Sequence, residues 1–395
     1  MGSTHSLVSW KRPFLVSLIS TLMVNSYLAM FLIYPIYLTK IGINPIYIGM
    51  LMSLFYLANM AVRPVGSTIL EILSIRKAAW LTFLLLLISS IGLTFSIDPK
   101  LIGLCRLLGG LGYGIGTVSL TAYQSLIVPE RIRGGAFAWI SVFYVSPQLL
   151  FVPIASYFLK TNRDVLYLLM FSLFSILFLL TALFLTDIKN IKIEDDNSKN
   201  SIVWGSYREL FRVRGIFTYI ISILAFSMIN GTILMYVSSL SNEKGLNPSL
   251  FLSTNASVAL MIRIAGNRIM NQLNRYRWLG ISLLSMAIST FLLGYSSNSI
   301  HLVLLSLTYG SGMAISFPFL LAIASDITPI SLRPKASAVA WIMMDLGYIL
   351  APLIIGFTSS TRDISYSFKF ISLLLLPIIL LVSFLWRRFL RFRSL

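Results

Sequence analysis

Long apolar runs follow one another through almost the whole of this 395-residue chain. A hydrocarbon core about 30 Å thick needs about 20 apolar residues per helical span, and we mark twelve runs of roughly this length. Because the backbone of a continuous apolar run in lipid must be satisfied within that run, each is predicted to be a helix, and a transmembrane barrel is excluded. The predicted spans are 13–38, 46–70, 79–97, 101–128, 135–159, 165–186, 216–240, 248–271, 278–296, 301–325, 335–358 and 366–386.

One polar segment interrupts the apolar pattern between the sixth and seventh runs. It reads TDIKNIKIEDDNSKNSIVWGSYRELFRVRG, and it mixes both signs of charge. This segment divides the twelve runs into two groups of six. We predict an all-α membrane protein with an N-terminal six-helix bundle at 1–190, a cytoplasmic central linker at 191–212 and a C-terminal six-helix bundle at 213–395.

The two halves repeat the same residues at an offset of 200 positions. MAVRPVGSTILEILSIRK and LMIRIAGNRIMNQLNRYR share an arginine, a glycine and a closing basic residue. The matching pairs are Arg63 and Arg263, Gly66 and Gly266, Lys77 and Arg277, and Pro129 and Pro329. GINP and GLNP also recur before the second run of each half, and their Asn and Pro are favoured residues at a helix start. We therefore expect two pseudo-symmetric bundles.

The basic residues are unevenly distributed, although the net charge of +18 alone would suggest a nucleic-acid partner. With both termini placed in the cytoplasm, most of the 31 lysines and arginines fall in inner segments and few fall in outer loops. This is the positive-inside pattern of membrane proteins. It predicts a multi-pass protein of the cell membrane with both termini cytoplasmic, and it needs no nucleic acid.

The repeated loops resemble those of the major facilitator superfamily of secondary transporters, with its drug and metabolite exporters. RPVGSTILEILSIRK is similar to the family motif between the second and third spans, although its glycine comes one position early and its acid is Glu. The fifth span departs from the antiporter pattern, since QLLFVPIAS keeps Pro153 without the glycines. The resemblance implies gating roles for Arg63, Gly66, Glu71, Arg76, Lys77, Arg133, Arg263, Gly266 and Arg333.

The family architecture implies that the first, fourth, seventh and tenth spans line a central cavity between the halves. These spans offer aromatic and amide side chains and almost no acid, which suits a moderately apolar or anionic organic solute. The candidates are Asn25, Tyr34, Tyr113, Gln124, Asn230 and Tyr309. Polar side chains in spans also join helices to one another, and this structural alternative stays open for each residue.

Two charges lie inside predicted spans and are candidates for proton coupling. Asp345 lies 12 residues beyond Arg333, about 18 Å along a helix and near the bilayer midplane. No other acid lies at that depth in the predicted spans. The alternative to proton coupling is that Asp345 forms a structural ion pair with a neighbouring helix. Arg106 lies near the outer end of the fourth span, where it either extends to water or faces the cavity.

These features leave three classes of function. We expect a secondary transporter that moves a small organic molecule by alternating access, as a proton-coupled exporter of drug-like compounds or metabolites. The alternative is a proton-coupled importer of sugars or organic anions. A channel lacks a charged ring, and a membrane enzyme lacks a catalytic constellation. We expect no cofactor and no metal, and we expect a functional monomer in the lipid bilayer.

Overall fold

Helices that are long enough to cross a membrane dominate the structure, a computed structural model that describes residues 8–65, 73–128, 133–187, 191–192, 206–265 and 273–393. Eleven helical segments of these ranges are long and apolar enough to span a bilayer, and a shorter apolar helix occupies Pro248–Ile262. The prediction of an all-α membrane protein is confirmed. Its one exception among the described residues is a parallel pair of two-residue strands.

The first half of the chain carries the first six spans and both strands. In order, its elements are β1 (Val8–Ser9), α1 (Lys11–Met30), α2 (Tyr34–Lys40), α3 (Pro45–Val62), the 3-10 helix η1 (Arg63–Val65), α5 (Ile75–Phe95), α6 (Pro99–Ile127), α7 (Arg133–Leu150), α8 (Val152–Lys160), α9 (Asp164–Ala182) and β2 (Ile191–Lys192).

The second half repeats the series of long helices. In order, its elements are α10 (Tyr207–Leu210), α11 (Ile216–Glu243), α12 (Pro248–Ala265), α14 (Arg275–Leu293), α15 (Ser299–Ile327), the 3-10 helix η4 (Ile330–Leu332), α16 (Arg333–Thr361) and α17 (Ile364–Arg393). α6 and α15 have the same length and start 200 positions apart, as the sequence repeat predicts.

Two of the predicted spans are each divided into two helices. The first span breaks between α1 and α2, where Pro35 occupies the first turn of the new helix. The fifth breaks at Phe151 between α7 and α8, with Pro153 in the first turn of α8. Proline has no backbone N–H and disfavours a helical conformation in the residue before it, which explains why both helices restart at these positions.

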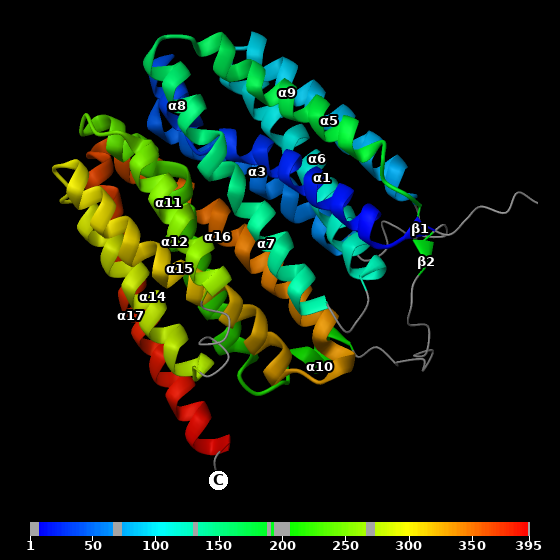
Figure 1. The fold of residues 1–395 in the computed structure, drawn as a ribbon. Helices are drawn as coiled ribbons and strands as arrows, with labels where there is room; N and C mark the ends of the chain where they lie inside the picture. Colours follow the sequence, from blue (N-terminus) through cyan, green and yellow to red (C-terminus); the bar gives the residue numbers. More distant parts are fainter. Residues whose placement is uncertain are drawn as a thin grey trace, which may run out of the picture. The chain divides into compact units, whose positions relative to one another are not determined.

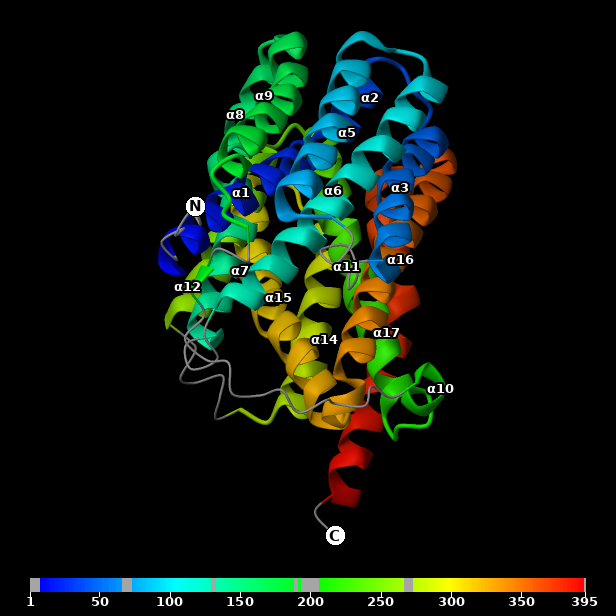
Figure 2. The same cartoon turned by 90° about the vertical axis from the view of Figure 1, so that its right-hand side faces the viewer.

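Contacts between residues divide the chain into two compact units. The first unit comprises Met1–Phe31 and Ala58–Ser201, and the second comprises Leu32–Leu57 and Ile202–Leu395. The break in the first span therefore coincides with a boundary between the units. Within the first unit α5 lies beside α6 and α9, and within the second α14 lies beside α15 and α17 (Figures 1 and 2).

The repeated GINP and GLNP segments start α3 and α12 as predicted. Asn44 Oδ1 accepts the backbone N–H of Ile46 at 2.9 Å, and Asn247 Oδ1 accepts that of Ser249 at 3.1 Å. Gly42 and Gly245 have positive φ values of 82° and 67°, which glycine adopts without steric cost. Each segment therefore ends one helix and caps the next.

Small residues bring neighbouring helices together at the same places in both halves. A methyl group on Gly112 of α6 would lie 2.9 Å from Leu85 Cβ of α5, and one on Gly312 of α15 would lie 2.7 Å from Ser282 O of α14. Ser316 in turn donates to Ser282 Oγ at 2.7 Å. Close helix packing thus explains the glycines of the fourth span.

α16 uses glycines in the same way within the second unit. Gly347 packs directly against Ser227 of α11, so that a side chain at position 347 has no space. Farther along α16, a methyl group on Gly356 would lie 2.9 Å from Gly49 Cα of α3. Residues 45–57 of α3 and the helix α11 are therefore both held against α16 at backbone distance.

Lys244, just beyond α11, closes the end of α14. Its Nζ donates to the carbonyl oxygens of Leu293 at 3.2 Å, Gly294 at 2.9 Å and Ser296 at 2.8 Å. The last carbonyls of a helix have no partner within the helix, and a cation there is favoured by the helix dipole.

Replacing Lys244 with Met is expected to destabilise the protein by about 1–3 kcal/mol, because these carbonyls lose a charged donor. Thermal unfolding of the purified protein measures the effect, and Lys160→Met at the exposed end of α8 is the control. Equal melting temperatures for the two variants would contradict the capping role.

Candidate functional site

Arg106 is fully buried in the first unit, so its side chain does not extend to water. α6 places its guanidinium carbon 3.9 Å from the centroid of the Phe31 ring. A guanidinium over an aromatic face is attracted by the ring quadrupole, and the attraction strengthens away from water. Phe31 is the last residue of the first unit's opening segment, so Arg106 is held where the first span breaks.

A chain of hydroxyl groups fixes the same part of α6. The Tyr27 hydroxyl lies 2.8 Å from Ser89 Oγ, and Ser89 Oγ donates to the carbonyl oxygen of Cys105 at 2.7 Å. Gly109 leaves room for this chain, because a methyl group there would lie 2.8 Å from Ser89 Oγ. The sequence analysis did not identify this chain, since Tyr27 and Ser89 have no distinctive spacing.

Three of the cavity candidates join α1 to α6. The Tyr113 hydroxyl donates to Asn25 Oδ1 at 2.9 Å. One turn away on α1, Thr21 Oγ1 accepts a hydrogen bond from Gln124 Nε2 at 3.0 Å. All of these side chains are buried, so within this unit they form an interhelical network.

The second unit contains a similar network between α11, α15 and α16. The Tyr309 hydroxyl donates to Asn230 Oδ1 at 2.7 Å, and Asn230 Nδ2 donates to the Tyr348 hydroxyl at 2.8 Å. Tyr348 was not predicted, although it lies three residues after Asp345 and therefore on the same side of α16. Its ring centroid is 4.9 Å from that of Tyr56 in α3.

Each half thus contains an asparagine of its first long helix bonded to a tyrosine of its fourth span. The pairs are Asn25 with Tyr113 and Asn230 with Tyr309. The sequence offset of 200 does not relate these residues to one another, so the repeat of the pair is visible only in the structure. The two halves use the same chemistry to join corresponding helices.

Replacing Tyr309 with Phe is expected to cost about 1–3 kcal/mol, because the buried Asn230 oxygen loses its donor. Tyr113→Phe is the equivalent change in the first half and is expected to have a similar effect. The melting temperature of the purified protein measures both, with Tyr157→Phe at an exposed site as control. If all three variants have the same melting temperature, the two hydrogen-bonded pairs contribute nothing to helix association.

Asp345 of α16 is only 2% exposed. Among the described acids it alone is buried, and the others lie at helix ends or in loops. An acid inside a span is costly and marks a candidate functional site. Asp345 belongs to the second unit and Arg106 to the first, and the buried candidate Tyr34 of α2 is also in the second unit.

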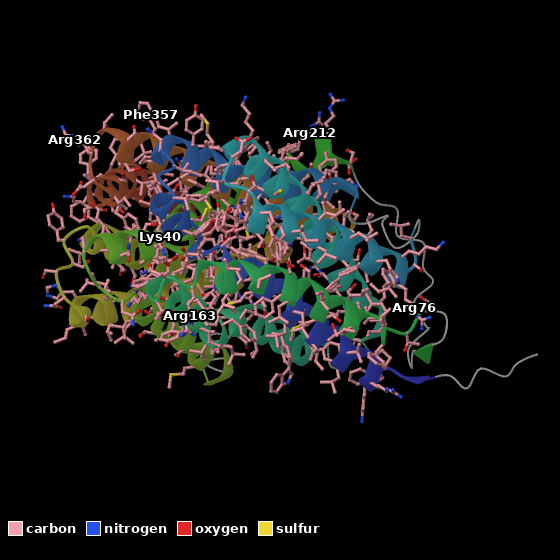
Figure 3. The ribbon with its side chains drawn as sticks, turned by 90° about the horizontal axis from the view of Figure 1, so that it is seen from above. Lys40, Arg76, Arg163, Arg212, Phe357 and Arg362 are labelled. Carbon is pink, nitrogen blue, oxygen red and sulfur yellow. The ribbon has the colours of Figure 1, made fainter. Side chains whose placement is uncertain are left out.

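The basic candidates of the loops lie at helix ends. Arg63 is half-buried in η1, Lys77 is exposed in the first turn of α5, and Arg333 is exposed at the start of α16. Arg76 Nε donates to the carbonyl oxygen of Leu185 at 3.0 Å, and Figure 3 shows Arg76 and Arg163 toward opposite ends of the first unit. Gly66, Glu71, Gly266 and the side chains of Arg133 and Arg263 lie outside the described residues.

One ion pair at an end of the second unit was not predicted. Arg275 Nη1 lies 3.0 and 2.9 Å from the two oxygens of Asp326, and it joins the start of α14 to the end of α15. The repeat could not reveal this ion pair, because the first half has no charged residues at the equivalent positions. Among the described residues, no three of His, Cys, Asp and Glu gather as metal ligands.

The comparisons with known proteins agree with this architecture. The Major Facilitator Superfamily matches residues 14–279 and 249–391, whereas no curated protein matches the chain. A mutant of the nucleoside transporter NupG is similar in structure, with a TM-score of 0.75, 13% identity and coverage of 96% of this chain and 99% of that one.

Two further solved structures are similar. A D-xylose-proton symporter gives a TM-score of 0.73 at 16% identity, and covers 94% of this chain and 96% of its own. A POT family transporter in complex with a thioalcohol-conjugated peptide gives a TM-score of 0.74 at 14% identity, and the match covers 94% of this chain and 95% of that one. At these low sequence identities, the similarity shows only that the folds are alike.

Proposed function

Since this chain belongs to the Major Facilitator Superfamily, a family of transporters rather than enzymes, we propose that it is a proton-coupled secondary transporter of a small organic solute. The proposed moving bodies are residues 1–190 and 213–395, joined by the linker 191–212. They would expose a midplane binding site to each side of the membrane in turn. The observation that carries the proposal is the burial of Asp345 inside a membrane-spanning helix.

Proton coupling requires a group that exchanges a proton during the cycle. Asp345 is the proposed group, because an acid inside a span is costly and marks a candidate functional site. Arg106 is the proposed partner charge, because its burial and its contact with Phe31 hold it away from water. It would interact with an anionic group of the solute or with the coupling carboxylate.

The solute is proposed to be neutral or anionic, with hydrogen-bonding groups and some apolar surface. Support comes from the candidates Asn25, Tyr34, Tyr113, Gln124, Asn230 and Tyr309, which carry aromatic, hydroxyl and amide groups and no acid. The Asn–Tyr bonds already satisfy part of these groups. A solute would therefore contact their remaining lone pairs and ring faces.

The inner loops are proposed to close the cytoplasmic side when the site opens outward. Arg76, Lys77 and Arg333 would supply the basic side chains of this closure, together with Arg63, Gly66, Glu71, Arg133, Arg263 and Gly266. The distribution of basic residues supports a cell-membrane location with both termini cytoplasmic.

Efflux of drug-like compounds or metabolites is the first direction proposed. Uptake by symport is the second candidate, because the similar D-xylose-proton symporter carries its sugar with a proton. The fifth span also favours symport, since it lacks the glycines of the antiporter pattern.

Vesicles of both orientations, incubated with a panel of labelled nucleosides, sugars, organic anions and aromatic drugs in the external medium, test the function and its direction. Accumulation in inverted vesicles that are acidic inside would support efflux. Accumulation in right-side-out vesicles that are alkaline inside would support symport. Flux that is independent of every imposed pH gradient would contradict proton coupling.

A further inference from the structure

Two helices of the second unit, α14 and α17, lie side by side and run in opposite directions (Figures 1 and 2). A methyl group on Gly280 would lie 2.5 Å from Ser383 Oγ, and one on Gly294 would lie 2.8 Å from Lys369 Cγ. The residue numbers therefore rise along one helix where they fall along the other. The start of α14 meets the end of α17.

Each of these two helices carries one stripe of exposed apolar side chains. Within each stripe the residues follow one another at intervals of four and seven, which places them on one side of the helix. The stripe of α14 consists of Ile281, Ile288 and Leu292, and that of α17 consists of Leu373, Leu380 and Phe384. Both helices are long and apolar enough to span a bilayer, so acyl chains are the natural cover for such stripes.

The two stripes lie on the same side of the helix pair. Successive residues of an α-helix are about 100° apart around its axis. Ile281 is therefore about a quarter turn from the contact residue Gly280, and Phe384 is about a quarter turn from Ser383, in the same rotational sense. In an antiparallel pair, equal rotations away from the line of contact lead to the same side. The stripes thus form one continuous apolar face.

An exposed arginine ends each stripe, and both arginines lie at the same end of the pair. Arg277 comes one turn before Ile281 on α14, and Arg387 comes nearly one turn after Phe384 on α17. Within the part of the chain that the structure describes, neither side chain takes part in an ion pair or a hydrogen bond. Two cations therefore lie beside the line of contact, where the apolar face ends.

Aromatic packing fixes the backbone from which both arginines extend. Arg277 directly follows Tyr276, and Arg387 directly follows Trp386, and the centroids of these two buried rings are 5.1 Å apart. Trp386 Nε1 also donates to Ser222 Oγ of α11 at 3.0 Å. The two positions are thus held together before any ligand binds, which lowers the entropic cost of binding.

We propose that this face binds one anionic phospholipid of the surrounding membrane. Its phosphate would lie between Arg277 and Arg387, and its acyl chains would follow the two stripes. A guanidinium group binds phosphate oxygens through two N–H donors at once. Basic residues at helix ends orient a membrane protein through their number, whereas this site requires these two arginines at this place. Lipid binding here depends on neither proton coupling nor solute transport.

Native mass spectrometry of the purified full chain in detergent measures the binding. The probes are phosphatidylglycerol and phosphatidylcholine with the same acyl chains, since the choline cation neutralises the phosphate charge. The first phosphatidylglycerol is expected to bind at least about tenfold more tightly than the first phosphatidylcholine. The double variant Arg277→Gln/Arg387→Gln is expected to lose this preference.

Arg208→Gln/Arg212→Gln is the matched control, because it removes two exposed arginines in and beside α10, which packs against α16 and η4. It should keep the preference, and melting temperatures in lipid-free detergent verify that both double variants fold. Equal binding of the two lipids to the wild-type protein would overturn the proposal, as would equal effects of the two double variants.

Soluble glycerol 3-phosphate distinguishes a lipid site from a simple anion site. It carries the phosphate without acyl chains, so it is expected to displace bound phosphatidylglycerol only at far higher concentration. Displacement at equal concentration would show that the apolar stripes contribute nothing and would also overturn the proposal. A transport screen that fails while phosphatidylglycerol binding persists would count only against the proposed function.

Discussion

Replacing Asp345 with Asn is expected to abolish the accumulation of solute that a pH gradient drives. Exchange of labelled for unlabelled solute should continue, because asparagine has nearly the same size as aspartate but cannot bind and release a proton at physiological pH. The loss should be complete rather than partial, since no other described acid is buried in a span.

Proteoliposomes with purified protein measure both quantities in one preparation. Asp164→Asn at the start of α9 is the control, because it removes an acid from the end of a helix rather than from its buried face. Continued exchange in the Asp345→Asn variant demonstrates that the protein is folded. Accumulation at the wild-type level would instead make Asp345 a structural acid.

Replacing Gly347 with Val is expected to destabilise the second half severely. A β-carbon at this position would overlap the Ser227 side chain and lie 2.9 Å from the backbone nitrogen of Met228. Overpacking typically costs about 1–3 kcal/mol, and occasionally more, where neighbours must shift. Backbone atoms are involved here, so we expect a cost at the upper end and a large loss of monodisperse protein.

Size-exclusion profiles and melting temperatures of the detergent-solubilised protein measure this effect. Leu353→Val, six residues along the same helix at an exposed position, introduces the same residue without overlap. If the two variants behave alike, α11 and α16 do not pack at the distance described.

Much of the fold could be predicted because lipid imposes a simple requirement. Each span must satisfy its backbone internally, so run length alone locates helices such as α6 and α15. The capping roles of Asn44 and Asn247 were also predictable, because an N-cap depends on neighbouring residues. The breaks after Met30 and Leu150 were missed, since a short turn within an apolar run does not change its hydropathy.

The candidate site was predictable in composition but not in geometry. Asp345 and Arg106 stood out because charges in spans are rare. The role of Arg106 depends on tertiary packing, and its complete burial beside Phe31 shows that it does not reach water. The bonds that link Asn25 to Tyr113 and Asn230 to Tyr309 join residues that are 88 and 79 positions apart, so no local pattern reveals them.

The exchange of protons that accompanies solute movement tests the central claim most directly. Proteoliposomes that contain a pH-sensitive dye, with no imposed gradient, receive a solute identified in the vesicle screen. The account predicts a change of internal pH that follows solute entry in the wild-type protein and is absent in Asp345→Asn. Solute entry into wild-type proteoliposomes without any proton movement would contradict it.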